Sequence, residues 1–195
     1  AMRLLLDQQY DEQAGLLKQE LFKVDQYANL ALKFVKLGDI SADLVISRCD
    51  LNEIVHTEVK KYSLLFVYNK LTIRIDELAR DIPSDSMWLG FIIGQLLSNS
   101  VKYTRTGGVR IYMQGAALVV EDSGIGIRKE DLPRIFEKGY TGYNGRMDNR
   151  ASGIGLYLSK RAADALGITI DVASELGKGT RVTLRFPKYD EFEHL

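Results

Sequence analysis

Apolar residues recur at helical spacing near the start of the chain. Residues 16 to 37 contain no glycine or proline, and their apolar side chains alternate gaps of four and three: Leu17, Leu21, Val24, Ala28, Ala31 and Val35. This spacing is typical of a coiled-coil seam. A second apolar row makes the face wider than a two-stranded seam needs: Tyr27, Leu30, Phe34 and Leu37. The pattern predicts an oligomerising helix, with packing inside its own domain as the alternative.

The residues on either side of this helix predict breaks in it. A turn is expected at Asp11–Gly15, and Gly38-Asp39 is expected to end the helix. A connector is expected from Ser41 to Arg48. After it, Asp50 has the position of an N-cap with a carboxylate three residues on, which predicts a helix to about Leu65.

From residue 69 onward, strand-like and helix-like patterns alternate, which predicts an α+β domain. The expected strands are residues 71–75, 109–114, 116–121, 168–174 and 180–186. The expected helices are residues 86–101, 130–136 and 153–166. The glycine-rich segment from Gly139 to Ser152 has no periodicity and is too long for a turn, so we expect a lid over a binding site.

Composition narrows the class of protein. The 195 residues include 26 Lys and Arg and 26 Asp and Glu, and this balance argues against nonspecific nucleic-acid binding. Hydrophobic residues make up 46% of the chain, enough for a packed core. Cys49 is the single cysteine, which excludes an internal disulfide. The sequence has no apolar run near the ~20 residues that cross a bilayer.

A polar stripe runs along the apolar helix expected at residues 86–101. Gln95, Asn99 and Lys102 are spaced by four and three residues and therefore share one face. The amide oxygen of Asn99 is a hard ligand that suits Mg²⁺, and Lys102 can meet phosphate charge. Tyr103 can cover a purine face. The stripe therefore indicates a nucleotide–metal site, and the alternative is a solvated polar edge.

Asp122 follows an apolar strand and precedes a Gly-x-Gly turn. A carboxylate at a strand end can accept a hydrogen bond from the amino group of adenine. Gly124 and Gly126 permit positive φ and a close approach of the backbone to a ligand. An ordinary Asp-Ser-Gly turn is the alternative.

A second glycine cluster, Ser152-Gly-Ile-Gly155, opens a helix whose first backbone N–H groups can hold phosphate oxygens. A capped helix start is the alternative. Neither glycine cluster has the spacing of a P-loop or of a Rossmann fingerprint. The phosphates would then be held by glycines, by the metal and by cations of the lid. Lys138, Arg146 and Arg150 are candidate cations, and a solvated basic loop is the alternative for each.

Together these motifs resemble the catalytic domain of histidine kinases, a branch of the ATPases that includes gyrase, the mismatch-repair ATPases and the large heat-shock chaperone. The resemblance covers about residues 50 to 187. The matching elements are the N box at 95–104, the G1 box at 122–126, the F box at 132–137, the G2 box at 153–155 and a last Gly-x-Gly-Thr element at 177–180. The resemblance implies a Bergerat ATP-binding fold, which is a two-layer α/β sandwich, with ATP and Mg²⁺ as cofactors.

The resemblance also implies roles for individual residues. Gln95, Asn99 and Lys102 become the catalytic candidates, and Asn99 becomes the Mg²⁺ ligand. Nucleotide contacts are implied for Asn99, Lys102, Tyr103, Asp122, Gly124, Gly126, Ile127, Lys138, Gly153, Ile154, Gly155, Leu156 and Thr180. Gln95 stands where the ATP-hydrolysing relatives carry a glutamate that activates water. An amide cannot act as a base, so slow hydrolysis is expected.

The helical front resembles the second helix of the dimerisation and phosphotransfer hairpin of such kinases. The resemblance is strongest to the small-sensor kinases of Gram-positive bacteria that work beside peptide-antibiotic transporters. We expect residues 1–48 to be part of this hairpin and residues 49–190 to be the ATP-binding domain. His56 and His194 do not fit the pattern around a phosphorylated histidine. The phosphoacceptor is therefore expected to precede Ala1, and no autophosphorylation of this chain is expected.

The function implied is transfer of the ATP γ-phosphoryl to that histidine and then to an aspartate of a response regulator. The expected partners are a response regulator and a second copy bound through the helical front, and a transporter or membrane sensor is a further candidate. The chain would be a cytoplasmic fragment of a protein anchored in the cell membrane. The alternatives are an ATP-gated clamp of the gyrase type and a protein Ser/Thr kinase of the same superfamily.

Overall fold

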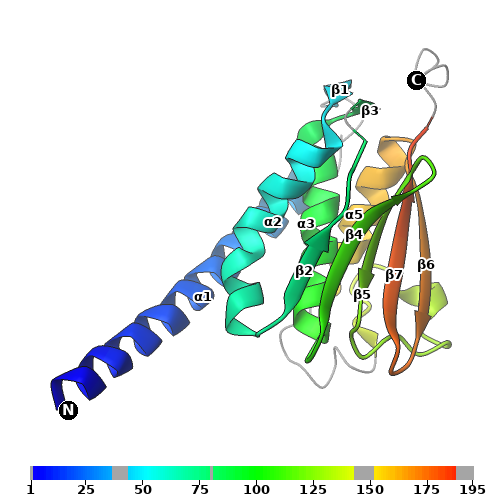
Figure 1. Cartoon of the computed structure of the whole chain (residues 1–195). Helices are drawn as coiled ribbons and strands as arrows, with labels where there is room; N and C mark the ends of the chain where they lie inside the picture. The colour runs from blue at the N-terminus through cyan, green and yellow to red at the C-terminus, as the bar shows by residue number, and fades with distance from the viewer. Residues whose placement is uncertain (1, 37–43, 80, 143–151, 188–195) are drawn as a thin grey trace. The chain divides into compact units, whose positions relative to one another are not determined.

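The computed structural model describes residues 2–36, 44–79, 81–142 and 152–187 (Figure 1). The chain forms two compact units, residues 1–38 and 39–195. None of the helices in the described ranges is both long and apolar enough for a membrane span.

The first unit is a single helix, α1 (Met2–Lys36). The turn predicted at Asp11–Gly15 is wrong, because α1 continues through this segment without a break. Gly15 has open space around it, and one glycine inside a helix costs only about 1 kcal/mol relative to alanine. Four residues of the predicted seam are at least 60% exposed: Leu17, Leu21, Val24 and Val35.

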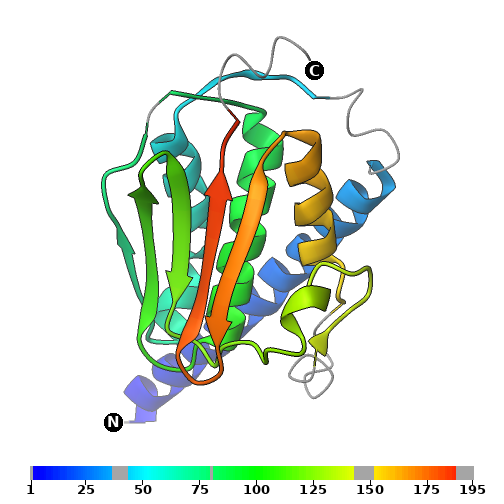
Figure 2. The same cartoon turned by 90° about the vertical axis from the view of Figure 1, so that its right-hand side faces the viewer.

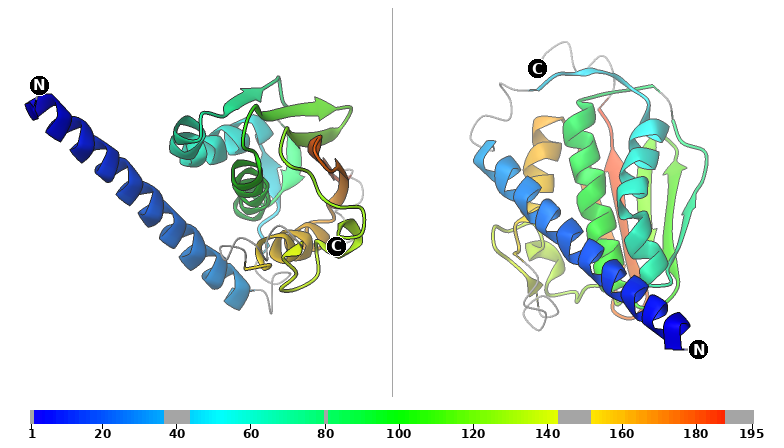
Figure 3. Two further views of the ribbon diagram at one scale, coloured as in Figure 1. Left: turned by 90° about the horizontal axis from the view of Figure 1, so that it is seen from below. Right: turned by 90° about the vertical axis from the view of Figure 1, so that its left-hand side faces the viewer.

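Within the described residues, the main body of the second unit is a two-layer sandwich, with helices on one face of a five-stranded sheet, which confirms the predicted α+β class. The sheet has the order β2-β4-β5-β7-β6. Its strands are β2 (Thr72–Ile75), β4 (Gly108–Gln114), β5 (Ala117–Asp122), β6 (Thr169–Glu175) and β7 (Gly179–Arg185). β2 pairs with β4 in parallel, and the other neighbours are antiparallel. One face of the sheet is covered by α2 (Leu51–Tyr68), α3 (Ser86–Tyr103) and α5 (Gly155–Ala165) (Figures 2 and 3).

The core lies between the sheet and the central helix α3. Five apolar side chains of α3 are at most 1% exposed: Trp88, Leu89, Ile92, Ile93 and Leu97. They oppose the inward-facing strand residues, such as Ile111, Leu118 and Leu184. Gly90 and Gly94 allow α2 to pack closely, since a Cβ at either position would lie 3.0–3.1 Å from a carboxylate oxygen of Glu58. This packing holds α3 in the middle of the helical layer.

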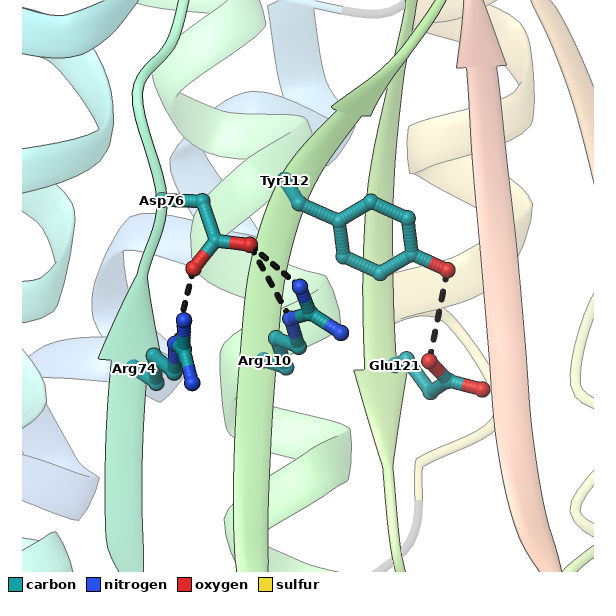
Figure 4. Close-up of polar contacts among 5 residues, drawn as sticks. All are labelled: Arg74, Asp76, Arg110, Tyr112 and Glu121. Carbon is teal, nitrogen blue, oxygen red and sulfur yellow. Dashed lines mark hydrogen bonds and ion pairs between the residues drawn. The ribbon is translucent and has the colours of Figure 1, made fainter.

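The opposite face of the sheet carries charged residues that pair across the strands (Figure 4). Asp76 follows β2 and accepts hydrogen bonds from Arg74 at 2.8 Å and Arg110 at 2.6 Å. Glu121 on β5 accepts one from the Tyr112 hydroxyl at 3.3 Å and one from Arg181 on β7 at 2.7 Å. These contacts link each strand from β2 to β7 with its neighbour.

Two short strands were not predicted. β1 (Ser47–Cys49) pairs with β3 (Ile82–Ser84) in an antiparallel two-stranded sheet. β1 begins inside the connector expected at residues 41–48, and β3 lies between β2 and α3. Three residues are too few to show a period of two, and Pro83 argued against a strand. The helix expected at residues 130–136 is instead a short 3₁₀ turn, η2 (Leu132–Arg134), with proline near its start. Helix α2 continues three residues past Leu65, to Tyr68.

Candidate functional site

Two segments that are distant from α3 in sequence contact its C-terminal half. The Ser100 hydroxyl on α3 donates to Asp122 Oδ2 at the end of β5, at 3.3 Å. The backbone of Ile125, in the glycine turn after β5, donates to the Tyr103 carbonyl at 3.0 Å. The start of α5 lies against the same helix, because a Cβ on Gly155 would lie 2.3 Å from Gln95 Oε1. The N box therefore adjoins both the G1 turn and the G2 helix start.

Asp122 is half-buried and receives only neutral donors from the described residues. The backbone N–H groups of Gly124 and Thr180 donate to Oδ1 at 2.9 Å and 3.2 Å. Burial raises the pKa of Asp122, and these hydrogen bonds and that of Ser100 oppose the rise. The charge of Glu121 raises this pKa further. The Asp122 carboxylate, at the end of β5 and with only neutral donors among the described residues, can accept a hydrogen bond from a ligand.

Two glycines with positive φ bring the strand ends around Asp122 together. A Cβ on Gly126 (φ 70°) would lie 2.1 Å from the Glu175 carbonyl oxygen. A Cβ on Gly179 (φ 102°) would lie 2.0 Å from the Asp122 carbonyl oxygen. Both positions therefore require glycine.

Ser174 connects the G1 turn to the last Gly-x-Gly-Thr element. Its hydroxyl accepts a hydrogen bond from the Ile127 backbone at 2.9 Å and lies 2.9 Å from the Thr180 hydroxyl. It also donates to the Gly179 carbonyl at 2.8 Å. Ser174 thereby links Ile127 to Thr180, whose backbone N–H donates to Asp122.

Three further polar side chains of the N box are half-buried: Asn99, Lys102 and Tyr103. The Lys102 ammonium lies 5.3 Å from the centroid of the Tyr103 ring. Asn99 is half-buried one residue before Ser100. Thr104 caps the helix and is 4% exposed, and its hydroxyl lacks a hydrogen-bond partner within the described residues.

The second glycine cluster adjoins the F-box segment. Gly139 donates to the Gly153 carbonyl at 3.0 Å, and a Cβ on Gly153 would lie 2.4 Å from the carbonyl carbon of Gly139. This contact places the backbone of Lys138, the residue before Gly139, next to the G2 box. Ile154 is the N-cap residue of α5, and Gly155 and Leu156 form its first turn.

Part of the predicted lid lies outside the described residues. Of the expected segment 139–152, residues 143–151 lie outside the described residues, and with them Arg146 and Arg150. The stem at residues 139–142 is described. There the Tyr140 hydroxyl donates to Asp131, and the Arg134 guanidinium lies 4.3 Å from the centroid of the Tyr140 ring.

Sequence reasoning missed Ser100 and Ser174. Ser100 is 3% exposed and lies on the side of α3 that is otherwise apolar. A buried hydroxyl beside the polar stripe requires a partner, and that requirement was the available signal. Ser174 is the last residue of the strand expected at residues 168–174, and nothing in the sequence around it indicated a buried hydroxyl that needs a partner.

The sandwich and the converging boxes define an ATPase-type domain. The chain matches the family described as histidine kinase-, DNA gyrase B- and HSP90-like ATPase over residues 84–190. With curated relatives also above 30% identity over nearly its whole length, the chain belongs to this family.

The curated relatives include sensor kinases. The chain is 36% identical to sensor protein BceS of Halalkalibacterium halodurans, over 98% of the chain and 59% of that protein. It is 36% identical to sensor protein BceS of Bacillus subtilis, over 100% of the chain and 60% of that protein. It is 34% identical to sensor protein kinase GraS of Staphylococcus aureus, over 98% and 57%. The chain therefore spans less than two thirds of the length of these relatives.

Solved structures show the same fold. Full-length ShkA in complex with AMPPNP superposes with a TM-score of 0.66 at 24% identity, over 80% of this chain and 34% of that one. Histidine kinase AdeS of Acinetobacter baumannii superposes with a TM-score of 0.65 at 20% identity, over 89% and 85%.

Proposed function

We propose that this chain is the ATP-binding catalytic core of a two-component sensor histidine kinase. It would transfer the γ-phosphoryl of ATP to a histidine outside residues 1–195, from which an aspartate of a response regulator receives it. The observation that carries this proposal is the contact of α3 with both glycine boxes, through Ser100 and Asp122 on one side and Gln95 and Gly155 on the other.

The base of the nucleotide would bind at the Asp122 end of the site. The carboxylate of Asp122 accepts from the adenine amino group, with Thr180 beside it. Tyr103 covers a face of the purine. Gly124, Gly126 and Ile127 form the turn after Asp122 and would present their backbone to the ligand.

The phosphates would bind between α3 and the start of α5. The Asn99 amide oxygen would hold Mg²⁺, which would supply neutralisation of phosphate charge. Lys102 and Lys138 contribute cationic side chains. The backbone N–H groups at Gly153, Ile154, Gly155 and Leu156 contribute the N-terminal end of a helix dipole. Catalysis in such a transfer consists mostly of positioning and charge neutralisation.

Gln95 is proposed to position the ligand and not to activate water. Its amide oxygen lies against Gly155, so the side chain is placed at the G2 box. A neutral amide has no basic lone pair of useful pKa, so attack by water is not promoted. Steady-state ATP hydrolysis is therefore expected to be slow, and brisk multiple-turnover hydrolysis would contradict this role.

The acceptor histidine is proposed to lie elsewhere in a longer protein. His56 is exposed on α2 and is not followed by the acidic residue expected directly after a phosphorylated histidine. His194 lies outside the described residues. In this proposal residues 1–48 belong to a dimerising helical hairpin and residues 49–190 to the catalytic domain. The exposed apolar row of α1 is the surface through which a second copy would bind.

The proposed cellular setting extends the likeness to sensor kinases. A response regulator is the acceptor of the phosphoryl group, and nucleic acid is not a partner. The chain is the cytoplasmic part of a protein anchored in the cell membrane. A transporter or membrane sensor is proposed as a partner of the parent protein.

Titration with a nonhydrolysable ATP analogue, with and without Mg²⁺, tests the binding site. Asn99→Ala is expected to remove most of the Mg²⁺-dependent part of the affinity. Gln114→Ala is the matched control, because it also removes an amide but lies at the far end of the β4–β5 hairpin. Absence of binding to the wild-type chain, or equal Mg²⁺ dependence in wild type and Asn99→Ala, would overturn the proposal.

A further inference from the structure

The hydroxyl of Ser100 contacts the carboxylate that the proposed function assigns to the base. Ser100 follows Asn99 on α3 and is 3% exposed. Its Oγ donates to Asp122 Oδ2 at 3.3 Å, and it is the side-chain donor to this carboxylate within the described part of the chain. The contact is separate from the polar stripe of Gln95, Asn99 and Lys102.

The hydrogen bonds of Asp122 leave one acceptor position open. An ionised carboxylate offers about four lone-pair positions, two on each oxygen. Gly124 and Thr180 occupy the two positions of Oδ1 through their backbone N–H groups. Ser100 occupies one position of Oδ2. Among the described residues nothing donates to the last position, which is therefore available to a single N–H donor.

We propose that Ser100 is a positioning residue for nucleotide binding. Its hydroxyl donates to one lone pair of Asp122 Oδ2 and so orients the carboxylate, and the other lone pair of Oδ2 accepts a single N–H from the amino group of the base. This inference rests on the proposed function, because it specifies how Asp122 recognises a 6-aminopurine. With alanine at position 100, Oδ2 loses its buried donor and faces a methyl group. The carboxylate is then harder to keep ionised and is no longer held in orientation on that side.

The pKa of Asp122 depends on its hydrogen bonds, and that of Ser100 is one of the three that lower it. Burial raises the pKa of Asp122, and the three hydrogen bonds are what opposes it. Neighbouring Glu121 raises it further, although its carboxylate is paired with Arg181 of β7 and faces the outer side with Arg110 of β4. On α3 the titratable side chains beside Ser100 are Lys102 and Tyr103, which contact each other. Loss of the Ser100 donor therefore moves the pKa of Asp122 upward.

The test compares Ser100→Ala with wild type by two measurements on the whole 195-residue chain. The first is the titration of the Asp122 carboxyl by carbon-13 NMR without nucleotide. The second is the affinity for the ATP analogue between pH 5 and pH 8. Ser100→Ala is expected to raise the titration midpoint and to weaken binding about fivefold at pH 7. The loss is expected to grow as the pH falls.

Three further variants make the result specific. Ser100→Thr keeps the hydroxyl and is expected to restore the wild-type titration and affinity. Ser100→Cys provides a weaker donor and is expected to shift both measurements in the direction of alanine, by less. Ser98→Ala removes a hydroxyl from the same helix without touching Asp122 and is expected to change neither.

An Asp122 titration that is identical in wild type and Ser100→Ala would overturn the inference, even if nucleotide binds. A loss of affinity that is independent of pH, or that threonine does not rescue, would overturn it as well. If wild type binds no nucleotide at any pH, the proposed function fails, and the NMR titration still decides whether Ser100 controls the carboxylate.

Discussion

Two aspartates of the same sheet show how the outer face differs from the site. Asp122 ends β5, Asp76 directly follows β2, and both side chains are half-buried. Asp76 is hydrogen-bonded to the guanidinium groups of Arg110 and Arg74, which lower its pKa (Figure 4). Asp122 is bonded to two backbone N–H groups and one hydroxyl, and burial raises its pKa. The two aspartates therefore hold similar positions at strand ends but have different hydrogen-bond partners.

The difference separates a structural carboxylate from one that is available to a ligand. The charge of Asp76 is neutralised within the sheet, and such exposed ion pairs add little stability. Burial disfavours the charged form of Asp122, and among the described residues no group donates to its last acceptor position. A perturbed carboxylate without a cation is typical of a functional site.

The largest expected effect is on nucleotide binding. Asp122→Asn is expected to weaken the affinity for an ATP analogue by roughly 1,000-fold or more, because the amide places an N–H where the base donates. Asp76→Asn makes the same chemical change on the outer face and is expected to leave the affinity unaltered. Calorimetric titration of both variants checks this. Similar affinities for the two variants would contradict the assignment of Asp122.

The next effect is expected on stability, at the glycine that packs against the backbone of Asp122. Gly179→Ala is expected to lower the free energy of unfolding by about 3 kcal/mol, because it adds a clash to a positive φ. The new Cβ would lie 2.0 Å from the Asp122 carbonyl oxygen. Gly115→Ala is the control at the opposite end of the β4–β5 hairpin, where φ is 61° and no atom lies within 4 Å. It should cost only about 1 kcal/mol.

Urea unfolding at neutral pH measures both glycine variants. Equal costs for the two substitutions would show that the contact with Asp122 contributes nothing beyond backbone strain. A large loss for Gly115→Ala would show that the hairpin turn is more constrained than its open surroundings indicate.

The sequence was sufficient to predict the elements whose periodicity is long. All five strands of the main sheet lie within one residue of their predicted bounds, because alternation over four to seven residues is a strong signal. The converging boxes could also be predicted, since Asn99, Asp122 and Gly155 occur in the order and spacing of a known family.

What could not be predicted depends on partners distant in the chain. β1 and β3 are defined by their pairing and are too short to show a pattern. The turn predicted at Asp11–Gly15 failed because a glycine alone does not end a helix. Ser100 was overlooked because its role depends on the orientation of Asp122, which is 22 residues further along the chain.

A smaller effect is expected on the stability of the Asp122 variant. The raised pKa means that the folded state holds the carboxyl proton more tightly than the unfolded state. Ionisation therefore costs stability as the pH rises from the ordinary pKa of 3.8 to the folded pKa, and the cost is constant above it. Asp122→Asn removes this cost, and its amide can still accept from Gly124 and donate to Ser100.

Asp122→Asn is thus expected to be about 1 kcal/mol more stable than wild type at pH 7, although it binds nucleotide poorly. The gain should vanish as the pH falls below 3.8, where the Asp122 carboxyl is protonated in both the folded and the unfolded state. Urea unfolding between pH 3 and pH 8 measures it. A variant that is less stable than wild type at pH 7 would show that the ionised carboxylate supports the fold.

The smallest effect is expected at Asp76. Its pKa is lowered in the folded state, so its ion pairs stabilise the protein above the ordinary pKa of 3.8, and this stability is lost as the pH falls through the folded pKa. Asp76→Asn should lower the urea midpoint slightly at pH 7, and less so in 1 M salt, because Arg74 and Arg110 are exposed. Asp171→Asn, which breaks a single pair with Arg185, should have a smaller effect still. A loss at Asp76 that is insensitive to both pH and salt would mean that packing, and not charge, joins β2 to the sheet.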